Sequence, residues 1–339
     1  MTVTETTKKK SQLKGSSSQR LFAFIALLAI YGVFAVFGNR FFTYNTFINI
    51  LDQSYYIGFL AVGVTFVIIT GGIDLSLGTV AMCSAMFGLI AFKAGVPFVL
   101  SLLIIALAGI TFGLLNGVLV SYLKLPAFIA TMGTMMIALG TSAIISNVQT
   151  QHFPSRADPV NGWFKSVFQN FEVITGPNPA DKFRVPSGAF WLIGTIILAI
   201  IVLNKTRVGR YTFAIGSNEE AVRLSGVEVR KWKIIPYAIS GLGSGLAGIM
   251  YGATFTTIYP QSGQGLELDA IAAVVIGGTS LSGGVGSILG TVIGVFIMSV
   301  LQVGLLSLGV QPHYQKVLTG VVVIVAVFID IQQHSRRET

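Results

Sequence analysis

Long stretches without a charged residue dominate this sequence, and they decide what the chain can fold into. They cover residues 21–38, 53–73, 75–92, 94–123, 125–151, 185–204, 234–266 and 270–315. A helix needs about 20 apolar residues to cross about 30 Å of hydrocarbon. Because only 10% of the 339 residues are charged and 53% are hydrophobic, the sequence predicts an all-α integral membrane protein.

About ten transmembrane helices fit these runs. Residues 270–315 can hold two of them, separated by the glycine-rich segment 277–286, and a last helix fits near 316–331 if Lys316 reaches a lipid headgroup. The transmembrane domain is therefore predicted over residues 21–331. Helix breaks are expected near 71–76 and 277–286.

Basic residues outside the runs predict the orientation. With the amino terminus in the cytoplasm, most of them fall on the cytoplasmic side, including five in residues 1–20 and seven in 205–233. Both termini are therefore predicted to be cytoplasmic tails, over 1–20 and 332–339. Topology and membrane lipid account for the net charge of +9 better than nucleic acid does.

Residues 148–187 are expected to form an extracytoplasmic loop. They hold five of the ten prolines, which argues against a folded domain. Trp163, Phe164 and Phe168 are expected to anchor the loop at the membrane interface. Within the spans, glycines at four-residue spacing predict close helix packing, in the rows Gly109, Gly113, Gly117 and Gly241, Gly245.

The join of the second and third runs carries an acidic residue among glycines, in the order Gly71, Gly72, Asp74 and Ser76. An ionised Asp inside a bilayer is unfavourable by about 2.5–3.5 kcal/mol, so Asp74 needs a partner. One interpretation is a helix break in which Asp74 caps the next helix; the other is a direct role in gating or in the substrate path. A similar string at Gly277 and Gly278 suggests a second break.

Several polar side chains inside or beside the spans are ambiguous. Asn116, Thr131 and Gln302, with the aromatic Phe128, would suit the path of a neutral polyhydroxylated solute, but they would equally suit bonds between helices. Glu267 and Asp269 precede an apolar run and are expected to be solvated at a helix start, with contact to an extracytoplasmic partner as the alternative. The single Cys83 is expected to pack in the interior, and no metal ligand set is apparent.

The stretch 205–236 is a charged interruption in an apolar chain. Ser217 and Glu220 have the spacing of a capping box, and Gly226 would end the short helix that follows. That helix would lie outside the membrane with Ala221 and Leu224 on one face. It is expected to be a handle for a partner protein.

Motifs of energy conversion and catalysis are missing from the sequence. It contains no G-x-x-x-x-G-K-[ST] phosphate loop and no nucleophile elbow. Carboxylates inside the spans are almost limited to Asp74, which disfavours a proton-coupled carrier. The chain is therefore expected not to be an enzyme, and its energy source is expected outside the chain.

Three segments together resemble the ribose-type permeases of bacterial ABC sugar importers. They are GGIDLSLG, YTFAIGSNEEAVRLSGVEVRKWKIIPY and LELDAIAAVVIGGTSLSGGVGSILGTVIGV, and the likeness runs over residues 39–330. The second segment is similar to the EAA loop of ABC importers, from which it differs at Val222 and in its spacing to Pro236.

The resemblance implies a multi-pass permease subunit of the bacterial inner membrane, paired with a second and usually identical permease. It also implies a cytoplasmic ATPase that uses ATP-Mg and an extracytoplasmic sugar-binding protein; no cofactor belongs to the chain itself. The residues implied in ATPase coupling are Ser217, Glu219, Glu220, Ala221, Arg223, Leu224 and Gly226. An ion-coupled secondary sugar transporter and a channel remain the alternatives.

Overall fold

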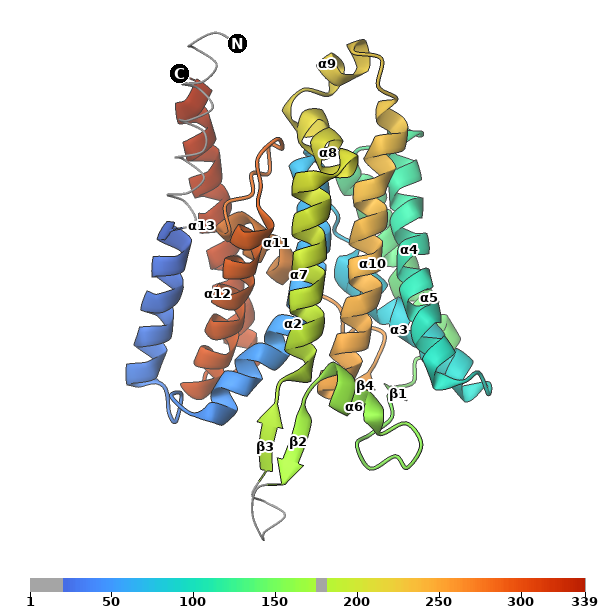
Figure 1. Ribbon diagram of the computed structural model, residues 1–339, viewed down its shortest axis with the longest axis vertical. Helices are drawn as coiled ribbons and strands as arrows, with labels where there is room; N and C mark the ends of the chain where they lie inside the picture. The colour runs from blue at the N-terminus through green and yellow to red at the C-terminus, as the bar shows by residue number, and fades with distance from the viewer. Residues whose placement is uncertain (1–20, 175–181, 339) are drawn as a thin grey trace.

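A computed structural model describes residues 21–174 and 182–338, most of which are helical (Figure 1). The first described helix is Leu21–Phe37. The others are α2 (Tyr44–Ile69), α3 (Leu77–Lys93), α4 (Phe98–Ser121), α5 (Ala127–Ser146), α6 (Trp163–Phe168), α7 (Ser187–Lys205), α8 (Arg207–Ser217), α9 (Glu219–Leu224), α10 (Val229–Phe255), α11 (Leu266–Ile276), α12 (Ile288–Ser307) and α13 (Pro312–Glu338). The predicted tail 1–20 lies outside the described residues.

The apolar runs form helices of membrane-spanning length. Among the described residues, α2, α4, α5, α7, α10 and α12 are long and apolar enough to cross a membrane, and Leu21–Phe37, Leu77–Lys93 and His313–Val325 are shorter apolar helices. The prediction of a mainly helical membrane protein is confirmed. The predicted ends of the helices were less accurate. Helix α2 starts directly after its N-cap Thr43, whose hydroxyl accepts the N–H of Thr46 at 3.3 Å. Helix α13 continues to Glu338.

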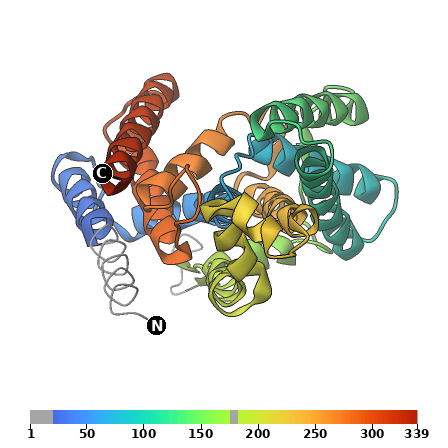
Figure 2. The same cartoon turned by 90° about the horizontal axis from the view of Figure 1, so that it is seen from above.

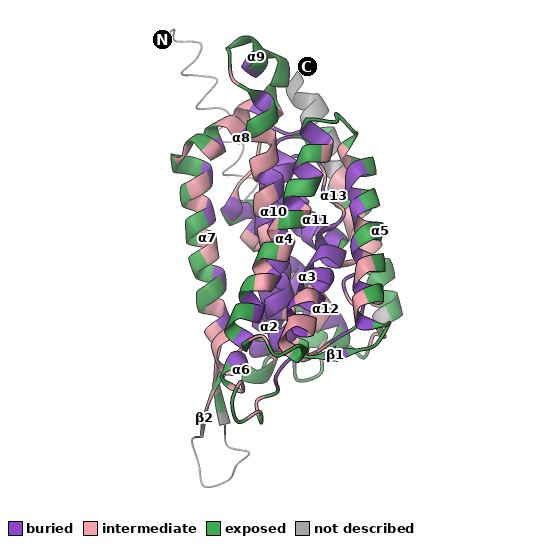
Figure 3. Cartoon of the chain, turned by 90° about the vertical axis from the view of Figure 1, so that its right-hand side faces the viewer, coloured by how far each residue is buried: buried purple, intermediate pink, exposed green. Residues whose placement is uncertain are grey.

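The buried centre of the bundle is formed by α2 and α3. Both are enclosed along most of their length, whereas α5 and α7 present exposed faces on the outside (Figure 3). Seen along the bundle, the helix Leu21–Phe37 and α13 lie on one flank and α4 with α5 on the other (Figure 2). An apolar exterior around a packed interior is the arrangement expected of a protein in lipid.

The glycine rows predicted to pack closely do so, between α4 and α10. A Cβ on Gly109 would lie 2.3 Å from the carbonyl O of Gly241, and a Cβ on Gly113 would lie 2.3 Å from the carbonyl O of Tyr237. The two backbones therefore touch with no side chain between them. Such close approach gives dispersion contacts where lipid offers no hydrophobic drive for association.

Replacing Gly113 with alanine is expected to destabilise the bundle by about 1–3 kcal/mol, because the new methyl group overlaps the backbone of α10. Thermal unfolding of the detergent-purified protein measures the loss. Gly133 of α5 is the matched control, since a Cβ there meets nothing within 4 Å. Equal melting temperatures for the two variants would contradict the close contact.

The described parts of the loop, residues 148–174 and 182–187, are more ordered than the prolines suggested. They contain α6 and an antiparallel hairpin of β2 (Phe171–Ile174) and β3 (Lys182–Val185), paired from Phe171 with Val185 to Ile174 with Lys182. A second ladder pairs β1 (Gln151–His152) with β4 (Thr257–Ile258). The predicted interfacial anchor is wrong for Phe164, which is fully buried and stacks on Phe153, because the loop folds back onto the bundle.

Candidate functional site

The first helix break holds a buried polar network around Asp74. Residues 70–76 leave the helical conformation between α2 and α3, as predicted, and Gly71 adopts a φ of +77° that favours glycine. The Asp74 carboxylate is 2% exposed. Its Oδ1 accepts bonds from the Ser76 N–H at 3.0 Å and the Ser76 hydroxyl at 2.6 Å, and its Oδ2 accepts from the Ser240 hydroxyl at 2.8 Å.

The network extends from Asp74 into α4 and α5. The Asn116 amide donates to the Ser76 hydroxyl at 2.9 Å, and the Thr134 hydroxyl donates to the Asn116 Oδ1 at 2.6 Å. These bonds join α3, α4, α5 and α10 around one carboxylate. The predicted capping of α3 by Asp74 takes a modified form: its N-cap is Ser76, and Asp74 binds the amide of that cap.

The side chains considered for a solute path lie in three different places. Asn116 and Thr131 are buried beside the first break, where Thr131 also donates to the Ala127 carbonyl at 2.8 Å. Phe128 is exposed on α5. Gln302 on α12 instead donates to the Asp269 carboxylate at 2.9 Å and accepts a bond from Gln53. Their role in a solute path stays a prediction.

The acidic pair at the start of α11 is not solvated as expected. Both residues lie in the first turn of the helix, but Glu267 is buried and its Oε1 accepts the N–H of Gly265 at 3.0 Å. Only one face of this first turn is enclosed, because Leu268 between the two acids is 45% exposed and Asp269 is half-buried. The sequence could not show this, because an acidic first turn also suits an exposed helix.

The second break separates α11 from α12 over residues 277–287. Gly277 has no room for a side chain, since a Cβ would lie 2.3 Å from the Gly290 carbonyl O, and Gly278 has a φ of +89°. The predicted break is confirmed. Gating by either break stays a prediction.

The cap of α9 differs from the predicted capping box. Asn218 is the N-cap, and its Oδ1 accepts the N–H of Ala221 at 2.9 Å. Ser217 ends α8, where its hydroxyl donates to the Phe213 carbonyl at 2.9 Å, and Glu220 pairs with Arg223. The predicted capping box does not form because Ser217 is the last residue of α8, a helix that the sequence did not predict.

Helix α9 projects from the end of the bundle and is fixed on one side only (Figure 1). Val222 packs into a small cluster with Ile215 of α8 and Val229 of α10, and Glu219 pairs with Lys233 at 2.8 Å. Ser217, Glu220, Ala221, Arg223, Leu224 and Gly226 are exposed. Gly226 ends the turn after α9 with a φ of +83°, as predicted. An apolar Val222 between the charged Glu220 and Arg223 was the available sequence signal for the anchor.

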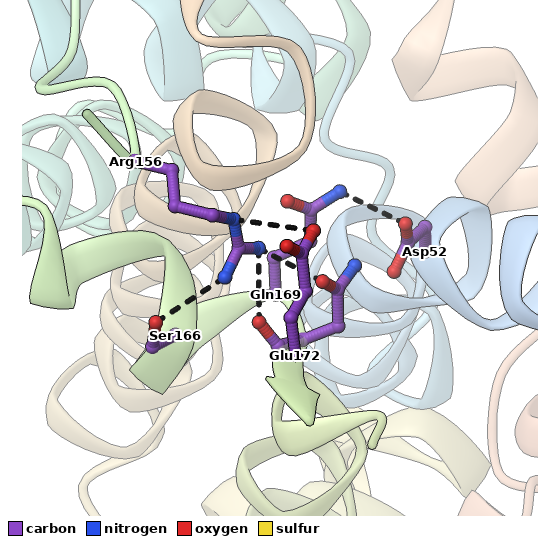
Figure 4. Close-up of polar contacts among 6 residues, drawn as sticks. Asp52, Arg156, Ser166, Gln169 and Glu172 are labelled. Carbon is purple, nitrogen blue, oxygen red and sulfur yellow. Dashed lines mark hydrogen bonds and ion pairs between the residues drawn. The ribbon is translucent and has the colours of Figure 1, made fainter. Parts of the chain in front are cut away.

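The opposite end of the bundle carries a second polar network, built around Arg156 (Figure 4). Its guanidinium donates to the Asn170 carbonyl at 3.0 Å and to the Ser166 hydroxyl at 3.3 Å, and it pairs with Glu172 at 3.4 Å. Gln169 donates to the buried Asp52 carboxylate of α2 at 2.9 Å (Figure 4). These bonds hold the loop on α2.

The same loop concentrates positive charge at this end. Burial, together with the nearby Arg156 charge, lowers the pKa of Lys165 on α6. Arg184 of β3 also lies within electrostatic reach of Asp52. The described part of this loop is therefore a charged surface that side-chain contacts hold on the bundle.

Replacing Arg156 with alanine is expected to loosen this loop without unfolding the bundle. The guanidinium would lose four contacts, which are those to Ser166, to Glu172 and to both the carbonyl O and the Oδ1 of Asn170. A hydrogen bond to a charged group contributes about 1.5–3 kcal/mol. Limited proteolysis of intact protein should cut within 156–174 markedly faster. Arg40→Ala is the control, because no acidic group of the described residues pairs with Arg40; equal cleavage rates would refute the prediction.

These features define a class: a helical, multi-pass membrane protein with two broken helices and a projecting helix at one end. A sequence model of the family described as "Branched-chain amino acid transport system / permease component" matches residues 46–327. The chain belongs to this family of permeases.

Individual relatives agree with the family. The chain is 40% identical to the Ribose import permease protein RbsC of Escherichia coli (strain K12), over 90% of this chain and 92% of that one. It is 35% identical to the Fructose import permease protein FrcC of Rhizobium meliloti, over 91% and 84%. It is 32% identical to the Galactose/methyl galactoside import permease protein MglC of Escherichia coli (strain K12), over 93% and 95%. No solved structure matches the chain.

Proposed function

We propose that this chain forms the translocation path of an ATP-binding cassette importer for ribose or a similar monosaccharide, in the inner membrane of a bacterium. Its relatives are named as sugar import permeases. The observation that carries the proposal is α9, which is anchored through Val222 and exposes its other faces. A motor protein needs such a rigid handle outside the bilayer.

The partners in this proposal are a second copy of the chain, a cytoplasmic ATPase and an extracytoplasmic sugar-binding protein. The ATPase hydrolyses ATP-Mg and engages α9, and the binding protein delivers sugar to the end that carries loop 148–187. Displacement of α9 tips the dimer between outward-open and inward-open states. Asn116, Phe128, Thr131 and Gln302 are the candidate path residues, and the two breaks are the candidate gates.

The proposed topology has about ten crossings with both termini in the cytoplasm. It is supported by α9 and the end of α13, which lie toward one end of the bundle, with the β2–β3 hairpin at the other (Figure 1). The short helices α3 and α11 each complete a crossing together with a break. A membrane-impermeant thiol reagent on intact cells should label a cysteine at Val160 and not one at Leu224, both of which are exposed.

Co-purification and uptake test the function. The chain extracted from its native membrane should retain an ATPase, and vesicles of the complex should take up labelled ribose, the probe, only with ATP and binding protein. Leu224→Asp should release the ATPase, whereas Val160→Asp at the opposite end should not. Ribose uptake by the chain alone in an ion gradient would indicate a secondary transporter, and passive flux without ATP would indicate a channel.

A further inference from the structure

Three backbone segments that are far apart in the sequence meet beside α9. They are the end of α2 at Ile69, the last turn of α8 at Gly216, and the tip of the second break at Gly284. The N–H of Gly284 donates to the carbonyl O of Ile69 at 2.8 Å. The last carbonyls of a helix have no partner within that helix, so the second break supplies one to α2.

Close backbone contact at this junction leaves no room for a side chain at Gly216 or Gly283. A Cβ on Gly216 would lie 1.8 Å from the Ile69 carbonyl O and 2.6 Å from the Gly284 N, the two atoms of that hydrogen bond. A Cβ on Gly283 would lie 2.9 Å from the Gly216 carbonyl O and 2.9 Å from the Gly71 N. At Gly216 and Gly283, both helix breaks and α8 therefore touch through backbone atoms.

The same junction is continuous with α9. Ser217 is the last residue of α8, and the next residue, Asn218, is the N-cap of α9. Ser217 also packs on the second break, since a Cβ on Gly284 would lie 2.7 Å from the Ser217 hydroxyl. Within the described residues, no linker separates α9 from the junction with the two helix breaks. Closely packed backbones shift together between discrete arrangements and do not absorb a displacement locally.

We propose that Gly216 and Gly284 are positioning residues that make α8 and both helix breaks move as one unit when α9 is displaced. This inference rests on the proposed function, in which a partner moves α9. It gives the glycine-rich segment 277–287 a role: through Gly284 it receives the displacement of α9 and passes it to α11 and α12. On the other side, Ile69 and Gly71 pass it toward Asp74.

Gly216→Ala tests the unit in the assembled complex. It leaves α9 itself unchanged, so the ATPase should remain bound and hydrolyse ATP, while ribose taken up per ATP falls about 5- to 150-fold, the usual range of a coupling free energy. Gly140→Ala and Gly194→Ala are matched controls, because a Cβ at either position meets nothing within 4 Å. Unchanged uptake per ATP in Gly216→Ala would overturn the inference; a wild-type chain that binds no ATPase would refute the proposed function itself.

A reversible tether tests the same unit in a chain whose junction glycines are intact. Cysteines replace Ser217 and Ser282, both exposed, in a Cys83→Ala background, and a short cleavable thiol cross-linker joins them. Because Ser217 is also a candidate coupling residue, uptake by the tethered complex is compared with uptake by the same double-cysteine complex before cross-linking. If α8 and the second break move together, the tethered complex should retain ribose uptake. Uptake that stops on tethering and returns on cleavage would show that the two segments must separate, and it would overturn the inference.

Discussion

Replacing Asp74 with alanine is expected to abolish accumulation of folded protein in the membrane. The carboxylate is buried and accepts bonds from Ser76 and Ser240, and Asn116 lies at 3.4 Å from it. Alanine would leave these donors unpartnered in a closed site, at about 1–3 kcal/mol for each. Two such losses are a large part of a total stability of about 5–15 kcal/mol.

Asp74→Asn is expected to preserve most of the yield. Its amide oxygen can still accept from Ser76, and the Ser240 hydroxyl can accept from the amide N–H where it now donates. Ser84→Ala is the control for a buried polar group, because the Ser84 hydroxyl has no partner to lose among the described residues. Size-exclusion chromatography of detergent extracts measures folded yield. Full yield of Asp74→Ala with a changed sugar preference would contradict the structural role.

The helix break at Asp74 was predictable from the sequence, but its partners were not. Adjacent glycines and an acid between two apolar runs leave few alternatives to an interrupted helix, since a charge in lipid is unfavourable. Asn116 and Ser240 come from helices far along the chain, and a serine inside an apolar run equally suits a bond within its own helix. Only packing between helices selects the partner.

For α9, too, some features were predictable from the sequence and others depend on tertiary packing. Its existence, its exposure and its end at Gly226 follow from local chemistry that is visible in the sequence. Its N-cap is Asn218 instead of the predicted Ser217, because Ser217 belongs to the last turn of α8. Its anchor is a tertiary contact of Val222 with Ile215 and Val229. The junction of Ile69, Gly216 and Gly284 is likewise a product of tertiary packing, in which a glycine is needed only because another backbone approaches.

Contacts at the two ends of the bundle differ in kind. The loop at the Arg156 end is held by charged side chains, which can exchange partners with an incoming protein surface at moderate cost. The α9 end is held by glycine backbones, which cannot rearrange without shifting whole helices. A rigid connection at the motor end and an adaptable surface at the opposite end suit a protein that is driven from one side and loaded from the other.

Gly226→Pro is expected to abolish sugar-stimulated ATP hydrolysis while leaving the bundle inserted. Gly226 has a φ of +83°, and its N–H donates to the Arg223 carbonyl at 3.1 Å. Proline fixes φ near −65° and has no N–H, a mismatch of about 3 kcal/mol or more, which reduces the native turn about 100-fold. The turn lies outside the bundle and a Cβ at Gly226 meets nothing within 4 Å, so the lesion stays local to α9.

Gly226→Asn and Gly309→Pro separate the effect of this turn from general damage to the protein. Gly226→Asn should keep coupling, because asparagine tolerates the left-handed region. Gly309→Pro introduces the same lesion at a turn with a φ of +75° between α12 and α13, and its complex should still bind the ATPase. Glu220→Arg reverses an exposed charge on α9, and the complex is expected to lose sugar-stimulated ATP hydrolysis with no change in folded yield.

If Gly226→Pro hydrolysed ATP at the wild-type sugar-stimulated rate, α9 would not be the element through which the ATPase acts.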